Sequence, residues 1–430
     1  MLTQYQPRGS GAKEIAANVE ADIAAGRLLP GSAVASVRTT AAALGVSTAT
    51  VAAAMADLKR RGVVVSRPRS GMQISPRPPV RPGVEPLEVP PGARDLVTGS
   101  PDPALLPDLA TALRAIEAPQ RLYGGEPVLP ELSEVAAAAF AADGIPATRI
   151  SALNGALDAI ERVLAAHLSP GDAVAVEDPG WPGVLDLARA LGLRLLPVEV
   201  DGRGMTPDAL TAALADGAQA VVLTPRGHNP CGSALDAERA QELRAALTDD
   251  VLVVEDDHLG PVAGTPWHTL VAGRERWAAV RSVSKWLGPD LRLALLTGDE
   301  TTLARVEGRQ ALGPGWVSSI VQRLAVAVWD DPVVARATEA YRERREALAA
   351  LVDAAPAPSG INLWIPVPDE YSAVRMLLDE GWAVAAGAPY RLSPGSAIRI
   401  TTAALEPDDA PALAQAIERA VSPPRRTRGA

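Results

Sequence analysis

The sequence predicts two folded parts of different classes: a small N-terminal domain of helices with a β-hairpin, and a larger α/β body that ends in a smaller α+β subdomain. A proline-rich run, PRPPVRPGVEPLEVPP, follows residue 75 and divides the two. Helical periodicity with glycine stops fills the segment before this run. After it, short apolar strands alternate with alanine-rich helices, which favours a largely parallel sheet. A chain of 430 residues also exceeds one ordinary core, so two or three domains are expected.

The N-terminal part has the order helix, short helix, glycine turn, helix, hairpin. The expected helices cover Lys13–Ala25, Ser36–Leu44 and Thr48–Arg61. Gly26 is a C-cap for the first helix, and Ser47 is an N-cap for the third. The apolar runs VVVSR and GMQIS, around Pro68 and Gly71, predict the hairpin. This order is typical of a winged helix-turn-helix.

The body shows the alternation of an α/β fold. The expected strands and helices are Ala173–Val176, Asp208–Ala215, Ala220–Leu223, Asp236–Leu247, Val251–Val254, Leu293–Leu296 and a long helix from Val333 to Val352. Because prolines favour an extended spacer, the domain boundary is placed in the proline-rich run. The predicted organisation is therefore residues 1–75 for the winged helix, 76–94 for the linker, 95–330 for the large domain and 331–430 for the C-terminal subdomain with a disordered tail.

Composition and charge narrow the function classes. No apolar run approaches the length of a membrane span, and the N-terminus lacks the apolar core of a signal peptide, so a cytoplasmic protein is expected. The single cysteine, Cys231, excludes an internal disulfide framework. The net charge is −10, but residues 1–75 hold nine Lys/Arg against four Asp/Glu, which leaves −15 for the rest. A basic module on an acidic body can still meet nucleic acid, because the local field decides.

The segment from Gly26 to Ile74 resembles the winged helix of the GntR class of bacterial regulators. It matches in Pro30-Gly31, Leu44-Gly45-Val46-Ser47 and Thr50-Val51, among other positions. The resemblance implies that the helix opened by Ser47 enters the major groove, with Thr48, Ala49 and Thr50 near base edges. Basic side chains would contact phosphates or the adjacent groove: Arg38, Lys59, Arg60, Arg67 and Arg69. Thr48 stands where the family often has Arg, and a solvated basic face is the simpler alternative.

The sequence SVSKWLGPDLRLA, from Ser282 to Ala294, resembles the lysine segment of class I aminotransferases of fold-type I, which use pyridoxal 5′-phosphate (PLP). In that family the Lys amine forms a Schiff base with the cofactor aldehyde, a role that falls on Lys285. Arg292 and the hydroxyls of Ser282 and Ser284 would hold the phosphate. A lone lysine is usually a surface residue, but this spacing after a strand is not typical of one.

Further matches occur in family order. Asn229 in HNPCG corresponds to the Asn that hydrogen-bonds the phenolic oxygen, and Trp181 in EDPGWPG to the aromatic residue that stacks on the ring. Asp256 corresponds to the partner of the pyridine nitrogen, although spacing does not separate it from Asp257. The backbone at Leu153 and Asn154 begins a helix that would receive the phosphate. Taken singly, these residues could be core, turn or surface positions.

Two residues correspond to ligand and dimer contacts. Arg399 in GSAIRIT matches the Arg that binds a substrate carboxylate, and Tyr123 matches a Tyr that reaches the partner subunit's phosphate. Several positions depart from the family pattern. His258 replaces a Tyr near the cofactor oxygen, and its variable charge would alter how the bound cofactor titrates. The other departures are Ala152 and Val128 for Gly, and Cys231 for Thr or Ser.

Over residues 10–420 the chain resembles the MocR/GabR family of PLP-dependent transcriptional regulators. The resemblance implies a homodimer, arranged head to tail, that reads two half-sites of operator DNA. It also implies a body that senses PLP, an amine or an amino acid, with no metal. An active aminotransferase that carries a DNA-binding arm is the chief alternative, and an effector-binding regulator with a decayed PLP site is the third. The sequence names neither effector nor operator.

Overall fold

The computed structural model describes residues 5, 7–24, 26–60, 63–67, 71–75 and 89–421. Residues 76–88 of the expected linker (76–94), the tail after 421, Arg61 and Arg69 lie outside the described residues, as do the side chains of Arg60 and Arg67. The chain divides into two compact units, one comprising 1–83, 168–174 and 182–196, the other 84–167, 175–181 and 197–430. Each is described by itself.

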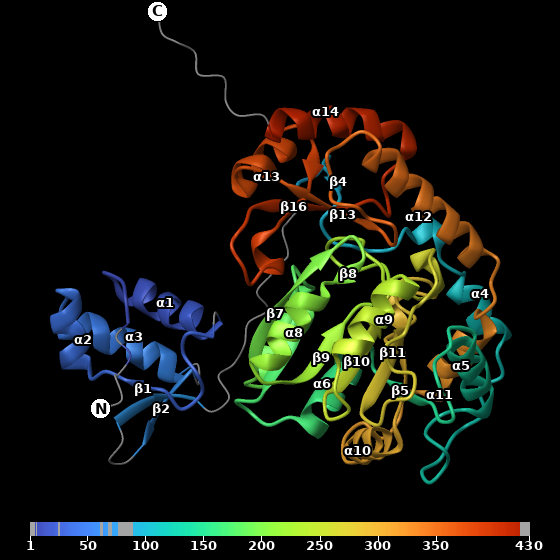
Figure 1. Ribbon diagram of the computed structural model, residues 1–430, viewed down its shortest axis with the longest axis horizontal. Coiled ribbons are helices and arrows are strands. Elements are labelled where there is room, and N and C mark those ends of the chain that lie inside the picture. The colour runs from blue at the N-terminus through green and yellow to red at the C-terminus, as the bar shows by residue number, and fades with distance from the viewer. Residues whose placement is uncertain are drawn as a thin grey trace, which may run out of the picture. The chain divides into compact units, whose positions relative to one another are not determined.

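The N-terminal part of the first unit has the predicted winged-helix order, drawn in blue in Figure 1. Its elements are α1 (Ala12–Ala24), β1 (Ala33–Val34), α2 (Val37–Leu44), α3 (Thr48–Arg60), β2 (Val64–Arg67) and β3 (Gly71–Ile74). The strands form an antiparallel sheet in the order β1-β3-β2. Ser47 accepts a hydrogen bond from the N–H of Thr50, so the predicted N-cap is present. Ser36, predicted as the first residue of the second helix, is instead its N-cap and accepts the N–H of Thr39. Ile15, Val51 and Leu58 lie at the centre of its apolar core.

An eight-stranded sheet forms the centre of the body, in the order β5-β12-β11-β10-β9-β6-β7-β8. The strands are β5 (Ser151–Leu153), β6 (Ala173–Asp178), β7 (Arg194–Asp201), β8 (Gly204–Met205), β9 (Ala218–Leu223), β10 (Leu252–Asp257), β11 (Trp277–Ser282) and β12 (Ala294–Gly298). Strands β9, β10 and β11 are parallel, whereas β12 is antiparallel to both β11 and β5. The sheet is therefore mixed at the β12 position, whereas its central strands are parallel, as the alternating pattern predicts for most of the sheet.

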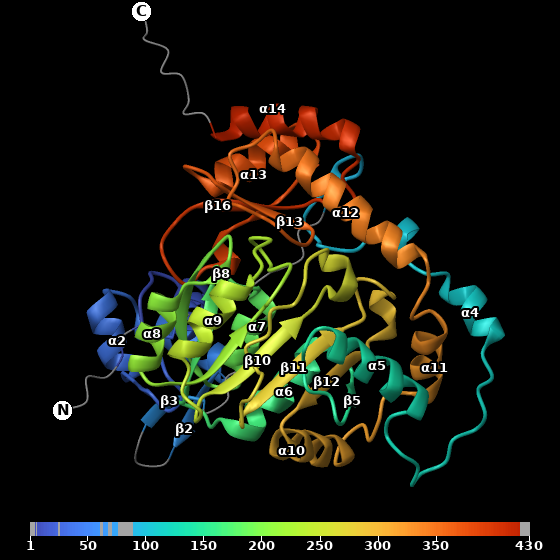
Figure 2. The same ribbon diagram turned by 45° about the vertical axis from the view of Figure 1, so that its right-hand side comes forward.

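Helices connect these strands and cover the sheet (Figures 1 and 2). They are α4 (Leu109–Ala115), α5 (Pro130–Ala142), α6 (Ala156–His167), α7 (Pro182–Ala190), α8 (Pro207–Ala215), α9 (Ala237–Ala246), α10 (Glu300–Ala311) and α11 (Ser319–Ala327). Helix α6 packs against β10, β11 and β12, and α8 packs against β9. The carboxyl ends of the parallel strands consequently meet along one edge, the usual place for a ligand site in an α/β sheet.

The C-terminal subdomain consists of a small antiparallel sheet and three helices. Its elements are α12 (Val333–Ala349), β13 (Asn362–Pro366), α13 (Glu370–Asp379), β14 (Trp382–Ala383), β15 (Ala385–Ala386), β16 (Ala397–Thr401) and α14 (Ala410–Val421). The sheet order is β13-β16-β15, and Leu363, Ile398 and Ile400 lie in the core beneath the helices. Strand β4 (Arg94–Asp95) pairs with β14. The first residues after the linker thus join the C-terminal subdomain, although the sequence analysis places residue 95 in the large domain.

Candidate functional site

Lys285 follows β11, at the carboxyl edge of the sheet. Its Nζ donates a hydrogen bond of 2.6 Å to the carbonyl oxygen of Gly99. Burial and the nearby charge of Arg399 lower the pKa of Lys285 to about 8. A much larger fraction of the amine is therefore uncharged near neutral pH than in an exposed lysine, and the uncharged form is the nucleophile. Lys285 is also the only lysine of the chain beyond Lys59.

The structure distinguishes the two adjacent aspartates at the end of β10. Burial would raise the pKa of Asp257, but the guanidinium groups of Arg226 and Arg281 outweigh it and hold the pKa below its usual range. Asp256 is 2% exposed, and its Oδ1 atom has no hydrogen-bond partner among the described residues. Burial, Asp257 and Glu177 raise the pKa of Asp256 to about 8. Only Asp256 therefore offers a free carboxyl to a ligand, as a partner of the pyridine nitrogen must.

Arg292 lies against the chain just before α6, where the sequence analysis expects the phosphate. An added Cβ at Gly155 would lie 2.6 Å from Nη2 of Arg292, so the close approach of this guanidinium requires glycine. Arg292 itself has a φ of 45°, which is uncommon for a side chain other than glycine. The Asn154 N–H already donates to the carboxylate of Asp158. The Asn154 amide, one of the two that the sequence indicates for the phosphate, therefore already has a partner within the chain.

Ser282, Ser284 and Trp181 lie at the carboxyl edge of the sheet, next to the strands that precede them. The Ser282 hydroxyl donates to Oγ of Ser284 over 3.1 Å, beside the lysine segment. Trp181 is half-buried and immediately precedes α7. Its position at the carboxyl end of β6 places it on the same sheet edge as Lys285 and Asp256.

His258 and Asn229 differ in what they can offer a ligand. Burial and the charge of Lys285 lower the pKa of His258 to about 3, so its imidazole is neutral near physiological pH. The expectation that His258 changes charge near neutral pH is therefore wrong. Oδ1 of Asn229 accepts a hydrogen bond of 3.4 Å from Arg399, which leaves the amide nitrogen of Asn229 as a donor for a cofactor oxygen.

Arg399 on β16 is a buried cation without a carboxylate partner among the described residues. It is 3% exposed, lies 5.2 Å from the centre of the Tyr390 ring, and donates through Nη2 to the carbonyl of Val97. Its Nε has no partner in the described part of the chain, and burial lowers the pKa of the group. Since an uncompensated buried guanidinium is costly, the arrangement fits an anionic ligand group such as a carboxylate.

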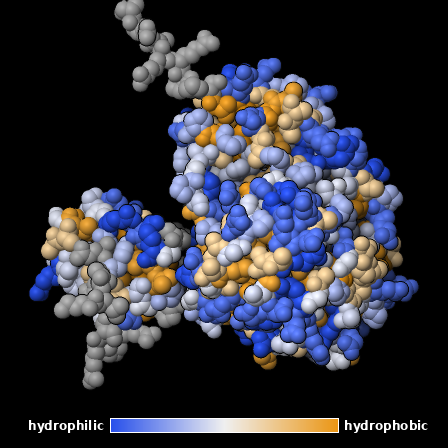
Figure 3. Space-filling model, viewed as in Figure 1, coloured by the Kyte–Doolittle hydropathy of each residue, from blue (hydrophilic) through white to orange (hydrophobic). Residues whose placement is uncertain are grey.

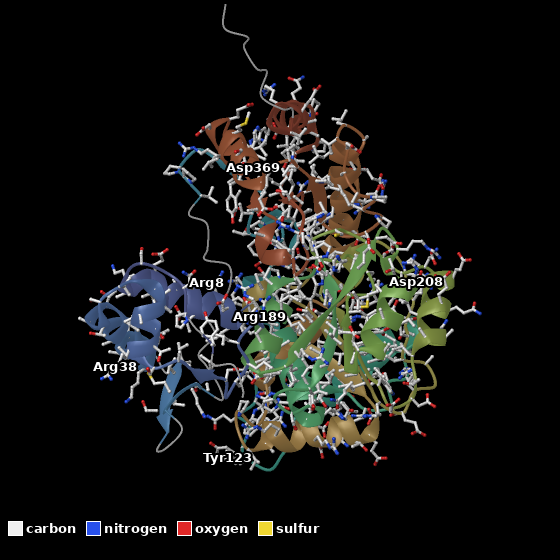
Figure 4. The ribbon with its side chains drawn as sticks, turned by 60° about the vertical axis from the view of Figure 1, so that its left-hand side comes forward. Arg8, Arg38, Tyr123, Arg189, Asp208 and Asp369 are labelled. Carbon is white, nitrogen blue, oxygen red and sulfur yellow. The ribbon has the colours of Figure 1, made fainter. Side chains whose placement is uncertain are left out.

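Tyr123 lies away from these residues in its own chain. Its side chain is 91% exposed and contacts Trp316 edge to face, with ring centres 5.7 Å apart. Figure 4 shows it at the outer end of its loop. Leu122, Leu113, Leu312 and Ile320 are large apolar side chains that are also exposed in this part of the chain. Polar side chains cover much of the face in Figure 3, with apolar patches between them.

The candidate DNA-contacting side chains that the structure describes lie on α2, on α3 and in the turn between them. Arg38 on α2 and Lys59 on α3 are exposed and form no ion pair with other described residues (Figure 4 labels Arg38). Ser47 and Thr48 are exposed at the start of α3, while the hydroxyl of Thr50 is bound to that of Ser47 at 2.8 Å. An exposed, polar start of α3, with basic side chains elsewhere on the helix pair, is compatible with the way a winged helix meets a duplex.

Sequence reasoning missed a structural use of two basic residues and several polar groups. Asp22 is buried and binds the guanidinium groups of Arg8 and Arg27, so these two cations stabilise the fold. Gly99, Glu177 and His228 were not singled out. Glu177 lies in EDPGWPG and His228 in HNPCG, next to Trp181 and Asn229, whereas Gly99 lies in no segment that the sequence analysis quotes. No local pattern indicates that His228 is a buried partner of Glu177.

The residues fit PLP. An unpaired carboxyl at Asp256, an amine of lowered pKa at Lys285 and a glycine-lined guanidinium at Arg292 match the cofactor's ring nitrogen, aldehyde and phosphate respectively. When bound, PLP supplies an aldehyde that condenses with amines and a ring whose protonated nitrogen withdraws electrons.

Comparison with known families gives the class of protein. Residues 12–74 match the family described as "Bacterial regulatory proteins, gntR family". Residues 95–417 match the family described as "Aminotransferase class I and II". The chain therefore joins a GntR-type helix-turn-helix domain to a class I/II aminotransferase domain, and its cofactor is PLP. In the described part of the chain, no helix is both long and apolar enough to cross a membrane.

Relatives give the particular family. The vitamin B6 salvage pathway transcriptional repressor PtsJ of Salmonella typhimurium is 39% identical, over 96% of this chain and 99% of the relative. The HTH-type transcriptional regulator TauR of Rhodobacter capsulatus is 30% identical over 77% of each chain. The alpha-aminoadipate aminotransferase LysN of Thermus thermophilus shares the fold, with a TM-score of 0.69 and 21% identity over 78% of this chain and 93% of its own. The chain belongs to the MocR/GabR family of PLP-dependent transcriptional regulators.

Proposed function

We propose that the operator affinity of this regulator changes when a ligand occupies the site of Lys285 and Arg399. The ligand is PLP itself, or an amine or amino acid that reacts with bound PLP. The 39% identity with a vitamin B6 salvage repressor favours PLP as the signal and repression as the response. The protein would act in the cytoplasm, where a bacterial regulator meets its operator.

One observation supports this proposal most strongly: a single short segment of the chain accepts hydrogen bonds from both Lys285 and Arg399. Gly99 offers its carbonyl to Nζ of Lys285, and Val97 offers its carbonyl to Nη2 of Arg399. We call residues 95–99 the latch segment. Asp95 shapes it, because its carboxylate accepts hydrogen bonds from the N–H groups of Val97 and Thr98.

Ligand binding would compete with the latch segment directly. Lys285 would hold the aldehyde of PLP through Nζ, and a nitrogen engaged in this way would have at most one proton left to donate. The bond to Gly99 would then be weakened or lost. A ligand carboxylate on Arg399 would likewise compete with the carbonyl of Val97, because a charged acceptor is the stronger one.

The latch segment follows the predicted linker along the chain. β4 and Leu96 bond to the β14 region through the carbonyls of Gly381 and Ala383, at 2.8 and 2.9 Å. A change at Val97 or Gly99 therefore acts within a few residues of the point where the linker enters the body. Coupling requires that the ligand favour one arrangement of the two units over another, which typically corresponds to about 5–150-fold in affinity.

We further propose that the active species is a homodimer, arranged head to tail. Tyr123 is too exposed to serve its own site, and the exposed apolar residues around it fit contact with a second copy. A dimer would present two winged helices to two half-sites, with Arg38, Lys59 and the start of α3 facing the duplex.

Operator titration tests the proposal. Wild type is measured without cofactor, with PLP, and with PLP plus candidate amines, beside Lys285→Ala and a protein truncated to begin at Asp95. Duplex affinity should reside in residues 1–75 and fall steeply with salt. PLP should change the operator affinity of the wild type. In Lys285→Ala, the part of this change that depends on covalent attachment of PLP should be lost. Identical curves in every state would contradict ligand coupling.

The latch is tested with a matched pair of variants. Asp95→Ala removes the carboxylate that shapes residues 97–98, whereas Asp108→Ala removes a cap of the same pattern at the start of α4. We expect Asp95→Ala to reduce the ligand-dependent change in operator affinity, while Asp108→Ala retains it. Equal responses in both variants would exclude the latch as the coupling element.

A working aminotransferase with a DNA-binding arm is the second candidate function. The combination of Lys285 with a lowered pKa and a buried Arg399 whose Nε has no partner among the described residues favours it, because an amine and a cation for the substrate carboxylate are what such a transamination site uses. Steady turnover of an amino donor with a 2-oxo acid, at rates typical of enzymes, would establish this activity.

A further inference from the structure

The end of β6 is bonded to a loop of the C-terminal subdomain. Residues 387–396 connect β15 to β16, and we call them the bridging loop. Asp178 is the last residue of β6 and is 7% exposed. Its Oδ1 and Oδ2 atoms accept the N–H groups of Leu392 and Ser393 at 2.8 and 2.9 Å. Because both oxygens of one buried carboxylate bind this loop, Asp178 fixes the position of the loop relative to the sheet.

Tyr390 of the bridging loop contacts both sides of the proposed ligand site. Its carbonyl accepts the N–H of Gly180 at 2.8 Å, one residue before Trp181. The centre of its ring lies 5.2 Å from Cζ of Arg399 and 6.0 Å, edge to face, from the ring of Trp364. Trp364 is the cross-strand neighbour of Arg399. Tyr390 therefore connects the segment expected to stack on PLP with the cation expected to bind a carboxylate.

Glu370 fixes the two ends of the bridging loop within the C-terminal subdomain. It is the first residue of α13 and is 4% exposed. Its carboxylate accepts the N–H groups of Ala388 and Ala397 at 3.0 and 3.3 Å. Loss of the bonds to Asp178 would therefore free residues 390–393, while the ends of the loop stay in place.

The position of the Tyr390 ring affects how Arg399 can bind a ligand. A guanidinium binds a carboxylate best when two of its N–H groups face the two oxygens, so its plane must be held. The face of an aromatic ring attracts a cation that lies over it. Nε of Arg399 has no partner among the described residues, and Nη2 donates to the carbonyl of Val97. The ring of Tyr390 is therefore one of the contacts that orient the guanidinium.

We propose that Asp178 is a positioning residue that sets the preference of the site for ligands with a carboxylate. Asp178 holds the bridging loop, the loop holds the Tyr390 ring over Arg399, and the ring orients the guanidinium. Asp178 itself contacts neither PLP nor the ligand in this proposal. The inference rests on the proposed binding of a ligand carboxylate by Arg399.

The ligand preference of the full-length protein loaded with PLP tests the inference. Standard amino acids are titrated beside the amines that lack only the carboxylate, and the absorbance of bound PLP reports binding. Asp178→Asn keeps one acceptor oxygen but turns an amide donor toward the second backbone N–H. Amino acids should then bind roughly 3–30-fold more weakly, the range of a contact between a cation and an aromatic ring. The amines should bind as they do to the wild type, because they do not use Arg399.

Asp299→Asn is the matched control for Asp178→Asn. The two oxygens of Asp299 likewise accept backbone N–H groups, those of Trp277 and Thr302, but at the amino end of β11. A readout without cofactor accompanies the titrations. In cofactor-free protein, hydrogen exchange of the Leu392 and Ser393 amides should be faster in Asp178→Asn and unchanged in Asp299→Asn.

Two variants of Tyr390 test whether Asp178 acts through the ring. Tyr390→Leu removes the ring but keeps the carbonyl that binds Gly180, so it should also weaken the binding of amino acids relative to amines. Tyr390→Phe keeps the ring and should retain the preference of the wild type. In the Tyr390→Leu background, Asp178→Asn should have little further effect, because both changes act on the same contact.

The outcomes separate the inference from the proposal on which it rests. A weaker preference for amino acids in Asp178→Asn and Tyr390→Leu, with Asp299→Asn and Tyr390→Phe unchanged, supports the inference. An unchanged preference in Asp178→Asn, or an equal loss for amino acids and amines, overturns it. If Asp178→Asn does not fold in thermal melting, equal preferences in Tyr390→Leu and Tyr390→Phe overturn it instead.

Arg399→Leu identifies which proposal has failed. If Arg399→Leu loses the preference for amino acids while Asp178→Asn keeps it, only the role of Asp178 is refuted. If the wild type and Arg399→Leu bind each amino acid as they bind its amine, the proposed role of Arg399 fails, and the inference fails with it.

Discussion

The cations of the winged helix and those of the ligand site carry the same charge in opposite surroundings. Arg38 and Lys59 are exposed, and ions of the solvent screen them. Arg399 is 3% exposed, and Lys285 is sufficiently buried that its pKa falls to about 8. Arg38 and Lys59 can each add only a small part of the free energy of DNA binding, because water and ions compete for them. Arg399 and Lys285 can bind a ligand without competition from water.

This difference predicts how each region responds to substitution. Phosphate contacts in water add up and depend on salt, so the loss of one is modest. A buried group that loses its partner leaves an uncompensated charge or donor, so single substitutions there have large effects. The following predictions test this contrast, from the largest expected effect to the smallest.

Replacement of Lys285 should have the largest effect. Lys285→Ala removes the amine that bonds to the aldehyde, so the absorbance band of lysine-bound PLP should disappear. Borohydride reduction of the wild type should fix PLP on a single peptide, because Lys13 and Lys59 are the only other lysines. Lys59→Ala should keep the band. Labelling of any peptide that lacks Lys285 would contradict the assignment.

Asp256→Asn should weaken PLP binding by about 10–150-fold, the range of roughly 1.5–3 kcal/mol for a hydrogen bond to a charged group. The reason is that Asn cannot carry the charge that pairs with a protonated ring nitrogen. Equilibrium titration by fluorescence measures the affinity, with the exposed Asp250→Asn as control. If Asp256→Asn bound PLP as the wild type does, Asp257 or another group would be the partner.

Arg399→Leu should weaken ligands that carry a carboxylate by roughly 10-fold or more, since a charge-assisted pair is lost. Ligand-free protein should keep its melting temperature, because the guanidinium has an unpartnered Nε and its burial is costly. Spectral titration with amino acids and with the matching amines separates the two effects. An equal loss for both ligand types would place the carboxylate elsewhere.

The rate of PLP attachment should rise with pH and level off above about 8, the pKa of Lys285. Removal of the Arg399 charge favours the protonated amine, so Arg399→Leu should shift this profile to higher pH. Stopped-flow absorbance measures the rate, and Arg375→Leu, at an exposed ion pair on α13, is the control. A profile that does not move would show that burial alone lowers the pKa.

Single substitutions on the winged helix should have the smallest effects. Arg38→Ala and Lys59→Ala should each lower the slope of log affinity against log salt by about one, if each contacts one phosphate. Lys13→Ala, on α1, should leave the slope unchanged. A large loss of affinity from one of these exposed residues at all salt concentrations would mean that the contrast between the two regions is wrong.

Local patterns predicted much of the fold, and tertiary packing decided the rest. The N-cap at Ser47 and the helix from Val333 are predicted from neighbouring residues, although that helix ends at Ala349 rather than Val352. The antiparallel direction of β12 depends on its neighbours β11 and β5, which lie far away in sequence.

The candidate site follows the same division. Lys285 and Arg292 belong to a spaced motif, so the sequence alone indicates them. The difference between Asp256 and Asp257 arises from Arg226 and Arg281, which approach from other strands and which spacing cannot reveal. The neutral state of His258 likewise follows from burial next to Lys285.

The scarcity of lysine has a consequence for how selectively such a protein can detect its signal. An aldehyde is an electrophile that modifies accessible amines on almost any protein surface. After Lys59, the cations that balance the many acidic residues of this chain are arginines, and Lys285 is the one lysine. Arginine is not a nucleophile at neutral pH. An aldehyde that collides with another part of the body finds no lysine amine there and forms no adduct. Covalent attachment of PLP to the body therefore indicates that the site of Lys285 is occupied.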